Sequence, residues 1–312
     1  AVTELVNICK GAVAVGFSTM TSQNLISAIF VSELLHKLGI YVFWAGTHAT
    51  LLPEIVLKCP YVDGVLRGEA EANLYQFYLY RLGKIGAKDI PGFCYKTKGG
   101  LFISPIPPIV SNDLLGYHPF DMIDINPYLD KPILERKNYI PGRMLPIMTS
   151  KGCVKKCSFC YNTIINRSIW RAYDLKRVFY EMDYLMYNYG VTGWLFYDDN
   201  FFIDKDRAWR ILERYKMPSS IEVDINRINE QFLEKAKRCN VSKLYIGIES
   251  GADSMLKRMH KGMTLETIKQ KVYLINTSGL RADLSFMMLF PNETASELNA
   301  TFELVHELER LP

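Results

Sequence analysis

The stretch "MLPIMTSKGCVKKCSFCYN", residues 144–162, leads from a short apolar run directly into a loop that holds three cysteines. Short apolar runs bounded by turn residues are typical of buried strands, and Cys153, Cys157 and Cys160 fall within eight positions. Because active sites of parallel α/β folds lie at the carboxyl ends of the strands, this order predicts a parallel sheet with a functional site after its first strand.

The sequence that follows keeps the same alternation of strand and helix. We expect strands near 145–149, 193–198, 220–225, 242–248 and 282–289, each followed by a helical segment. The helix after 264 should end before Gly279, and "TASE" at 294–297 is a capping box that opens the last helix. Five such units over 141–312 predict a partial (β/α) TIM-type barrel, because a closed barrel of eight units needs about 250 residues.

The sequence before the cysteines predicts a second α/β region. "GAVAVGFS" at 11–18 and "IYVFWAG" at 40–46 indicate strands around a helix that stops at Gly39. "VDGVLRGEAEANLYQFYLYRL" at 62–82 adds a short strand, a glycine turn at Gly68 and a helix starting at Glu69. We therefore expect a doubly wound, Rossmann-like domain over 1–83, and a proline-rich and glycine-rich linker over 84–140.

Composition excludes several classes of protein. The 312 residues are 49% hydrophobic and carry a net charge of +4, with no basic run typical of a nucleic-acid interface. No apolar run approaches the roughly 18 residues of a membrane-spanning helix. Seven cysteines, four of them scattered, do not form a disulfide framework, so we expect a cytoplasmic, reducing location. The chain starts at Ala1 without a leader, and we expect it to be truncated at both ends, with the final barrel units missing.

The three clustered cysteines predict a metal site. A structural zinc site usually has four ligands in two separated pairs, and no fourth cysteine or histidine lies near Cys160 in the sequence. Thiolates also hold iron–sulfur clusters, and three thiolates on a four-iron cluster leave one iron open to a ligand. An iron–sulfur cluster is therefore the favoured interpretation, and structural zinc is the alternative.

"CVKKCSFC" at 153–160 resembles the CxxxCxxC motif of radical S-adenosylmethionine (radical SAM) enzymes, including the aromatic Phe159 before the last cysteine. The resemblance implies a [4Fe-4S] cluster on Cys153, Cys157 and Cys160 whose open iron chelates S-adenosylmethionine. One electron from the cluster then cleaves this cofactor to methionine and a 5'-deoxyadenosyl radical. No catalytic residue is expected beyond the cluster ligands, and Phe159 is expected to contact the cofactor.

Three later strand ends resemble other segments of that family. "WLFYDDNFF" at 194–202 resembles the segment that contacts the methionyl amino group, and a helix cap, best supplied by Asp204, is the alternative role for its acids. "YIGIESG" at 245–251 resembles the segment that meets the ribose or carboxylate, with a polar turn as the alternative. The resemblance thus implies cofactor contacts by Asp198, Asp199, Asn200, Glu249 and Ser250.

The fifth strand departs from the family pattern. "LSFMMLFPNET" at 284–294 has Leu289 and Asn292 where the family usually has glycines, which weakens any argument for close backbone approach to a ligand. Met287 and Met288 are expected in the core rather than as sulfur ligands.

Small or hydroxyl-bearing turns follow the three strands of the first domain, in "VGFSTMTSQ" at 15–23, "WAGTHATLLPE" at 44–54 and "RGEAE" at 67–71. Such turns can receive an anionic ligand. Their order resembles the cobalamin-binding domain that precedes the barrel in one large radical SAM subfamily, although Ala70 replaces a usual glycine and the first strand-helix unit is missing. The resemblance implies a cobalamin groove lined by Ser18, Thr19, Thr21, Gly46, Thr47, His48, Gly68 and Glu69.

These observations predict a cobalamin-dependent radical SAM enzyme that carries out methyl transfer or ring closure on an unactivated carbon. A radical SAM enzyme with a vestigial cobalamin domain is the first alternative, and a non-catalytic iron–sulfur or zinc module is the second. The expected partners are a small-molecule or natural-product substrate and a reductant such as flavodoxin or ferredoxin.

Overall fold

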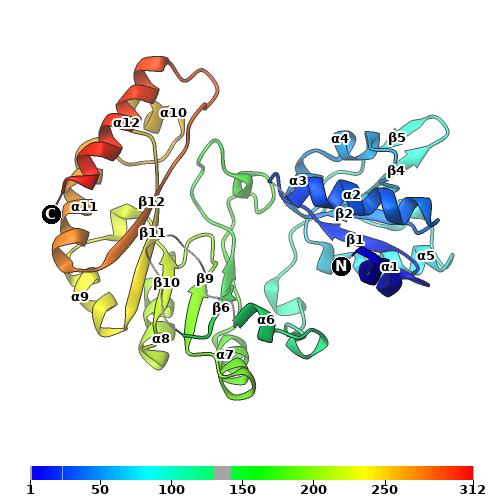
Figure 1. Ribbon diagram of the computed structural model, residues 1–312, viewed down its shortest axis with the longest axis horizontal. Coiled ribbons are helices and arrows are strands. Elements are labelled where there is room, and N and C mark those ends of the chain that lie inside the picture. Colours follow the sequence, from blue (N-terminus) through cyan, green and yellow to red (C-terminus); the bar gives the residue numbers. More distant parts are fainter. Residues whose placement is uncertain (1, 23, 130–141, 312) are drawn as a thin grey trace. The chain divides into compact units, whose positions relative to one another are not determined.

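The computed structural model describes residues 2–22, 24–129 and 142–311, and divides the chain into two compact units, Ala1–Leu115 and Gly116–Pro312. Each unit contains one five-stranded sheet (Figure 1). No helix in the described residues is long and apolar enough to cross a membrane.

The sheet of the first unit has the order β1-β2-β3-β4-β5. Strands β1 (Val15–Ser18), β2 (Val42–Ala45) and β3 (Gly64–Leu66) are parallel, whereas β4 (Phe93–Thr97) and β5 (Gly100–Phe102) are antiparallel additions. Strands β4 and β5 lie within the stretch 84–140 that the sequence suggested as a linker. Side chains of β4 add to the hydrophobic core on both faces of this sheet, because Cys94 is fully buried in one cluster and Phe93 in the other.

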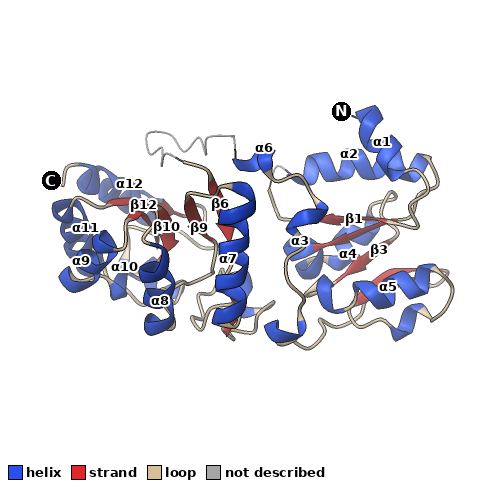
Figure 2. Cartoon of the chain, turned by 90° about the horizontal axis from the view of Figure 1, so that it is seen from below, coloured by secondary structure: helices blue, strands red, loops and turns tan. Residues whose placement is uncertain are grey.

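Helices cover both faces of this sheet (Figure 2). Val42 and Trp44 of β2 pack with α2 (Asn24–Lys37), α3 (Gly46–Leu51) and α4 (Pro53–Lys58), whereas Phe43 and Ala45 pack with α5 (Leu74–Arg81). This alternation follows from the period of two along a strand. The remaining helical segments are α1 (Val2–Cys9) and the 3-10 turns Ala70–Ala72, Ala87–Asp89 and Asn112–Leu114.

The sheet of the second unit is fully parallel, in the order β12-β11-β10-β9-β6. Its strands run one after another along the sheet, so each crossover places a helix on the same outer side, as Figures 1 and 2 show. The strands are β6 (Met144–Ile147), β9 (Gly193–Phe196), β10 (Ser219–Glu222), β11 (Val241–Glu249) and β12 (Arg281–Phe286).

The outer helices and the sheet enclose one large core, which includes Trp194, Phe201 and Phe202. A two-stranded ribbon of β7 (Ser150–Lys151) and β8 (Arg171–Ala172) flanks the cysteine loop. The helices are α6 (Asn126–Leu129), α7 (Leu175–Tyr189), α8 (Lys205–Tyr215), α9 (Glu230–Arg238), α10 (Asp253–Arg258), α11 (Leu265–Ser278) and α12 (Ala295–Glu309), with 3-10 turns Phe120–Met122, Tyr161–Thr163 and Ile225–Arg227.

Several local predictions are confirmed and one is wrong. Asp204 caps α8, Thr294 and Glu297 form the capping box of α12, and α11 ends at Gly279 with φ 79°. The helix predicted to start at Glu69 instead starts at Leu74. The cause is Asn73, which is buried and donates a 2.6 Å hydrogen bond from its amide to the Pro91 carbonyl, so the preceding residues form a tight 3-10 turn.

Candidate functional site

A cavity of about 140 Å³ lies where β6, β9, β10 and β11 end. All three clustered cysteines line it, as the sequence placed them at the carboxyl end of a first barrel strand. The lining residues are Cys153, Lys155, Cys157, Phe159, Cys160, Asn162, Asp199, Asn200, Glu222, Val223, Asp224, Gly247, Glu249, Lys261 and Met263.

The cysteine loop keeps its shape through contacts with neighbouring segments. Gly152 has φ 86°, and a side chain there would meet the Ile169 carbonyl oxygen at 2.0 Å, so only glycine fits. Its N–H donates to the Asp199 carboxylate at 2.7 Å, and the Ser158 N–H donates to the Met259 carbonyl at 3.0 Å. The loop is therefore fastened to the ends of two other strand-helix units.

The thiols lie in a weakly hydrated environment. Cys153 and Cys157 are buried and Cys160 is half-buried. Burial raises the pKa of both Cys157 and Cys160, and the nearby ammonium groups of Lys261 and Lys155 oppose that rise for Cys157. Within the described residues, no three acidic, histidine or cysteine side chains converge tightly enough to hold a single metal ion. All three thiols line the same cavity.

Asp198 does not line the cavity. Its carboxylate is fully buried and accepts hydrogen bonds from the N–H and hydroxyl of Thr149, at 3.1 and 2.8 Å, and from the Ser150 hydroxyl. Burial raises the pKa of Asp198, and these hydrogen bonds oppose the rise. Arg207 binds the same Thr149 hydroxyl at 3.0 Å. Asp198 thus joins the ends of β6 and β9, a different position from the one expected of a cofactor contact.

Asp199 and Asn200 do line the cavity. Asp199 accepts from the Gly152 N–H and from the Tyr161 hydroxyl, and burial beside this carboxylate raises the pKa of Tyr161. The Asn200 amide nitrogen lies 3.8 Å from the Cys153 sulfur. Its amide oxygen is buried and has no hydrogen-bond partner in the part of the chain that the structure describes. Such an oxygen is ready to accept a hydrogen bond from a ligand.

Glu249 reaches the cavity from a distorted strand end. The pairing of β11 with β12 shifts register between Gly247 and Glu249, and Glu249 has φ 74°, a backbone conformation unusual for a side-chain-bearing residue. Its carboxylate pairs with Lys261 at 2.8 Å. Ser250, by contrast, is fully buried away from the lining, where its hydroxyl lies 3.3 Å from that of Thr301.

Phe159 lines the cavity, as its place in the cysteine motif suggested. Its ring packs against a small buried cluster of Ala252, Met255 and Met259. The Lys261 ammonium lies 5.7 Å from the ring centre, within the range of a cation–π contact.

Sequence reasoning missed four charged lining residues, namely Lys155, Glu222, Asp224 and Lys261. A signal for Glu222 existed in "SSIEVD", because Ile221 and Val223 alternate with it on the buried side, so it must face the barrel interior at a strand end. Lys261 lies in a loop with no such periodicity, and only the fold brings it to the cavity.

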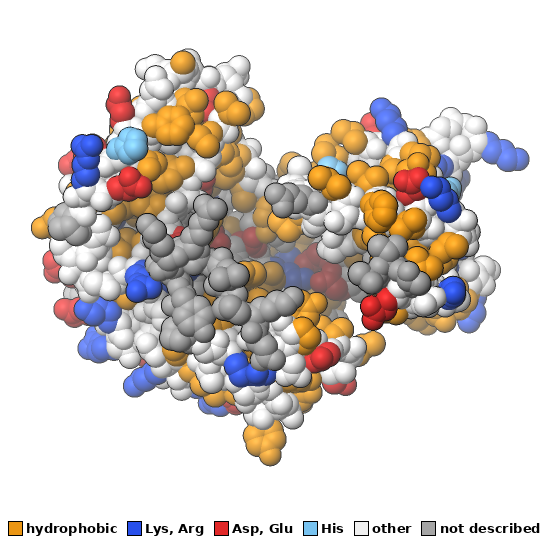
Figure 3. Space-filling view, in the orientation of Figure 1, with side chains coloured by type: hydrophobic (Ala, Val, Ile, Leu, Met, Phe, Trp, Pro, Cys, Tyr) orange, Lys and Arg blue, Asp and Glu red, His pale blue; other side chains and the backbone are white. Residues whose placement is uncertain are grey.

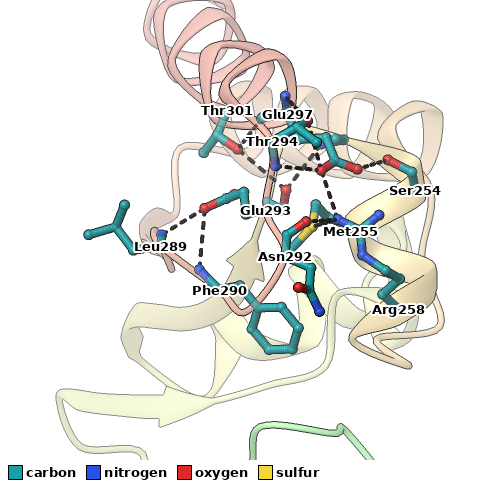
Figure 4. Close-up of polar contacts among 12 residues, drawn as sticks. Ser254, Met255, Arg258, Leu289, Phe290, Asn292, Glu293, Thr294, Glu297 and Thr301 are labelled. Carbon is teal, nitrogen blue, oxygen red and sulfur yellow. Dashed lines mark hydrogen bonds and ion pairs between the residues drawn. The ribbon is translucent and has the colours of Figure 1, made fainter.

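The turn between β12 and α12 has two residues in the left-handed region where the family usually has glycine: Leu289 with φ 61° and Asn292 with φ 65°. The Glu293 carboxylate holds this turn by accepting from the N–H groups of Leu289 at 2.7 Å and Phe290 at 3.3 Å, as Figure 4 shows. Met288 is 53% exposed, so its predicted core position is wrong, because the chain leaves the sheet after Phe286.

The first turn of α12, which follows this turn, is bonded to α10. Glu297 of α12 pairs with Arg258 at 2.7 Å and accepts a hydrogen bond from the Ser254 hydroxyl at 2.6 Å (Figure 4). Hydrophobic side chains are exposed on this face of the second unit (Figure 3), and Leu289, at 83%, is among the most exposed of them.

In the first unit, the predicted residues of the first two turns come together. The Thr19 N–H and hydroxyl both donate to the Ala45 carbonyl at 2.8 Å, and the His48 N–H donates to the Thr19 carbonyl at 3.0 Å. A side chain at Gly46, where φ is 85°, would meet Thr19 backbone atoms at 2.7 and 2.8 Å. Burial lowers the pKa of His48, whose ring nitrogen Nδ1 lies 2.8 Å from the Thr21 hydroxyl. Ser18 and Thr47 flank these contacts in sequence.

The third turn, at Gly68 and Glu69, makes contacts with other segments than the first two turns do. The Gly68 N–H donates to the Thr50 hydroxyl at 3.0 Å, and a side chain at Gly68 would meet the Pro107 ring at 3.1 Å. The positive φ of 80° and the tight contact with the chain's own "PIPP" segment both favour glycine at this position. Glu69 is partly buried beside it and begins the 3-10 turn.

Comparison with known proteins identifies a family whose model matches this chain. The model described as "Radical SAM superfamily" matches residues 147–305. An uncharacterized methyltransferase of Pyrococcus horikoshii is 28% identical over 300 residues, which cover 93% of this chain and 63% of the relative. The anaerobic magnesium-protoporphyrin IX monomethyl ester cyclase of Rubrivivax gelatinosus is 24% identical over 281 residues, which cover 84% and 48%. The chain therefore spans between about half and two thirds of the length of these relatives.

Several solved structures are similar over almost the whole chain. The radical S-adenosylmethionine methyltransferase TsrM of Kitasatospora setae, with cobalamin and a [4Fe-4S] cluster bound, superposes with a TM-score of 0.73 at 15% identity, covering 99% of this chain and 62% of that protein. Likeness at this level of identity shows the fold. The predicted α/β fold class, a Rossmann-like domain followed by a partial radical SAM barrel, is confirmed.

Proposed function

This chain belongs to the radical SAM superfamily of enzymes, and we propose that it holds a [4Fe-4S] cluster on Cys153, Cys157 and Cys160 and cleaves S-adenosylmethionine there. The observation that carries this proposal is the cavity at the carboxyl ends of the strands, which all three cysteines line. The next cysteine along the chain, Cys239, lies in the hydrophobic core and lines no part of that cavity.

The residues around the cysteines fit the proposed groups. The buried Asn200 amide oxygen without a partner in the described chain is an acceptor for the cofactor's ammonium group. When bound, the cluster supplies the electron that breaks a carbon–sulfur bond of S-adenosylmethionine and gives a 5'-deoxyadenosyl radical. The chain's own part is to hold the cofactor: Asp199 and Asn200 from the loop after β9, Glu249 from β11 and Phe159 from the cysteine loop line the cavity that it would occupy. Asp198 and Ser250 have structural roles in this proposal.

For the first unit we propose cobalamin binding at the turns of β1 and β2, through Ser18, Thr19, Thr21, Gly46, Thr47 and His48. Support comes from the close meeting of these two turns at Gly46 and from the cobalamin named for the similar structure. The proposed reaction is methyl transfer or ring closure on an unactivated carbon of a small molecule, because one relative is a methyltransferase and another a cyclase. A flavodoxin-like or ferredoxin-like protein would supply the electron.

One observation favours a second candidate, a radical SAM enzyme whose first unit does not use cobalamin. Gly68 and Glu69 belong to the expected groove, yet the space at Gly68 is filled by Pro107 of the same unit. Both candidates place the chemistry in a reducing compartment, which fits the seven free cysteines.

Anaerobic reconstitution tests the cluster. We expect about four irons per chain, retained by Cys59→Ala as the control and lost by Cys157→Ala. Addition of S-adenosylmethionine and dithionite should release 5'-deoxyadenosine. Bound zinc without iron would contradict the proposal.

Titration with hydroxocobalamin separates the two candidates for the first unit. Retention of cobalamin, weakened by Gly46→Ala, is expected if the first unit binds it. Absence of retention by a protein that takes up iron would favour the second candidate.

A further inference from the structure

The segment that carries the three cysteines is strongly basic. Residues 149–173 contain five lysine or arginine residues and no aspartate or glutamate, although acidic residues occupy 33 of the 312 positions in the chain. Lys155 pairs with Asp224 at 2.5 Å, whereas Lys156 is exposed and has no ion pair within the described residues. The segment therefore presents positive charge to the solvent. Its basic residues are Lys151, Lys155, Lys156, Arg167 and Arg171.

The same segment exposes apolar residues between its charges. Four of them are between 39% and 55% exposed, namely Val154, Tyr161, Ile164 and Ile169. Backbone contacts bring together the parts of the loop that carry them. The Ile164 N–H donates to the Tyr161 carbonyl at 3.0 Å. Gly152, two positions before Val154, lies against the carbonyl of Ile169. Exposed apolar residues with charged neighbours are typical of a surface that binds another protein.

This surface lies directly beside the predicted cluster ligands along the chain. Val154 follows Cys153, and Tyr161 follows Cys160. The Tyr161 hydroxyl also donates to the Asp199 carboxylate, which lines the cysteine cavity. A single peptide bond therefore separates each of two exposed residues from a ligand, and this gives a short covalent route from the protein surface to the sulfurs.

Given the proposed function, on which this step rests, we infer that the outer surface of the cysteine loop binds the reductant, and that this reductant is a small acidic flavoprotein. Carboxylates of the partner complement the basic residues, and the apolar edge of a flavin ring fits the apolar ones. The reduced flavin loses one electron and the cluster gains it, and no covalent bond forms or breaks. Interfaces between electron-transfer partners are small, so one loop is sufficient. This reductant surface comprises Val154, Lys156, Tyr161, Ile164, Arg167 and Ile169.

Anaerobic isothermal titration calorimetry of the reconstituted protein with oxidised flavodoxin tests the reductant surface directly. At low ionic strength, Lys156→Glu should weaken binding at least about threefold, because it replaces an attraction by a repulsion. At a salt concentration of about 0.5 M the difference should shrink, because charges are then screened beyond about 4 Å. Lys237→Glu is the matched control. Lys237 is exposed in the last turn of α9, which leads into the amino end of β11, and it donates to the Ser278 carbonyl at 2.8 Å.

Ile164→Ala tests the apolar part of the surface and leaves its charge unaltered. This variant should weaken binding of flavodoxin about threefold at both ionic strengths, because salt does not screen apolar contacts. Equal iron content in all variants verifies that the loop still receives the cluster.

A rate measurement connects binding to electron transfer. The rate of cluster reduction by limiting reduced flavodoxin is divided by the rate with dithionite for the same variant, so that a change in the cluster itself cancels. This ratio should fall at least about threefold in Lys156→Glu at low ionic strength and recover at high salt. A ratio equal to that of the unaltered protein would place electron entry elsewhere and overturn the inference.

The outcomes distinguish this inference from the proposed function. Equal binding of flavodoxin by Lys156→Glu, Ile164→Ala and the unaltered protein would overturn the reductant surface, and so would an equal loss in Lys237→Glu. Binding of an acidic ferredoxin in place of flavodoxin would overturn the assignment to a flavoprotein. In each case, iron uptake and release of 5'-deoxyadenosine with dithionite would leave the proposed function standing. If the unaltered protein showed neither, the proposed function and this inference would both be refuted.

Discussion

Replacing Leu289 by glycine should stabilise the protein, although glycine normally destabilises. Leu289 has φ 61°, a conformation that costs a side-chain-bearing residue about 1–2 kcal/mol and glycine almost nothing. Two losses oppose this gain. The greater freedom of glycine in the unfolded chain costs about 0.5–1 kcal/mol. Lost burial of the side chain costs roughly a few tenths of a kcal/mol, since that side chain is 83% exposed. The free energy of unfolding should therefore rise by about 0.5 kcal/mol.

The comparison with Leu289→Ala isolates the backbone contribution. Alanine keeps the strained Cβ, so Leu289→Ala should be slightly less stable than the unaltered protein and Leu289→Gly more stable than Leu289→Ala. At Glu303, an exposed position within α12, the order should be reversed, with Glu303→Gly about 1 kcal/mol below Glu303→Ala.

Urea denaturation followed by tryptophan fluorescence is a suitable assay, because Trp170, Trp194 and Trp209 all lie in the second unit. If Leu289→Gly proved less stable than Leu289→Ala by the usual glycine penalty, the turn would not store the strain that its backbone indicates.

Three other substitutions test particular contacts. Gly46→Ala should lower the free energy of unfolding by at least about 1 kcal/mol more than Gly39→Ala, because both residues have positive φ and only Gly46 lies against backbone atoms; equal losses in urea denaturation would contradict this. Gly251→Ala should destabilise by about 2 kcal/mol, since the new methyl group would meet the Ala300 carbonyl oxygen at 2.3 Å, and a thermal midpoint equal to that of the unaltered protein would refute the contact. Hydrogen bonds from Arg258 and Ser254 hold the pKa of Glu297 well below its ordinary value, so its contribution to stability is present at neutral pH and decreases progressively as pH falls below about 5. The stability gap between the unaltered protein and Glu297→Gln should therefore narrow from pH 5 to pH 3, and a gap that stays constant with pH would exclude this linkage.

Periodic patterns made most of the fold predictable. The five strand-helix units of the second unit follow from apolar runs alternating with helical faces, and the caps at Asp204, Thr294 and Gly279 are local chemistry that needs no tertiary information. The strands of 93–102 were missed because they join the first sheet antiparallel, in a stretch rich in glycine and proline.

The site was predictable only where one motif determines it. The three cysteines lie within eight positions of the sequence, so it could be inferred that they share one site. The roles of Asp198 and Asp199 depend on which side of the strand end each carboxylate leaves, and only the structure separates the buried one from the one in the cavity. Lys155 and Lys261 are 106 positions apart in sequence and meet through the fold.

The contacts of the cysteine loop link the spacing of its thiols to the rest of the barrel. Gly152, Ser158 and Lys155 are each bonded to another segment of the second unit. The arrangement of the three thiols therefore depends on the folded unit as well as on the eight-residue motif. A substitution in one of those distant segments can displace the cysteines while the motif itself stays unaltered.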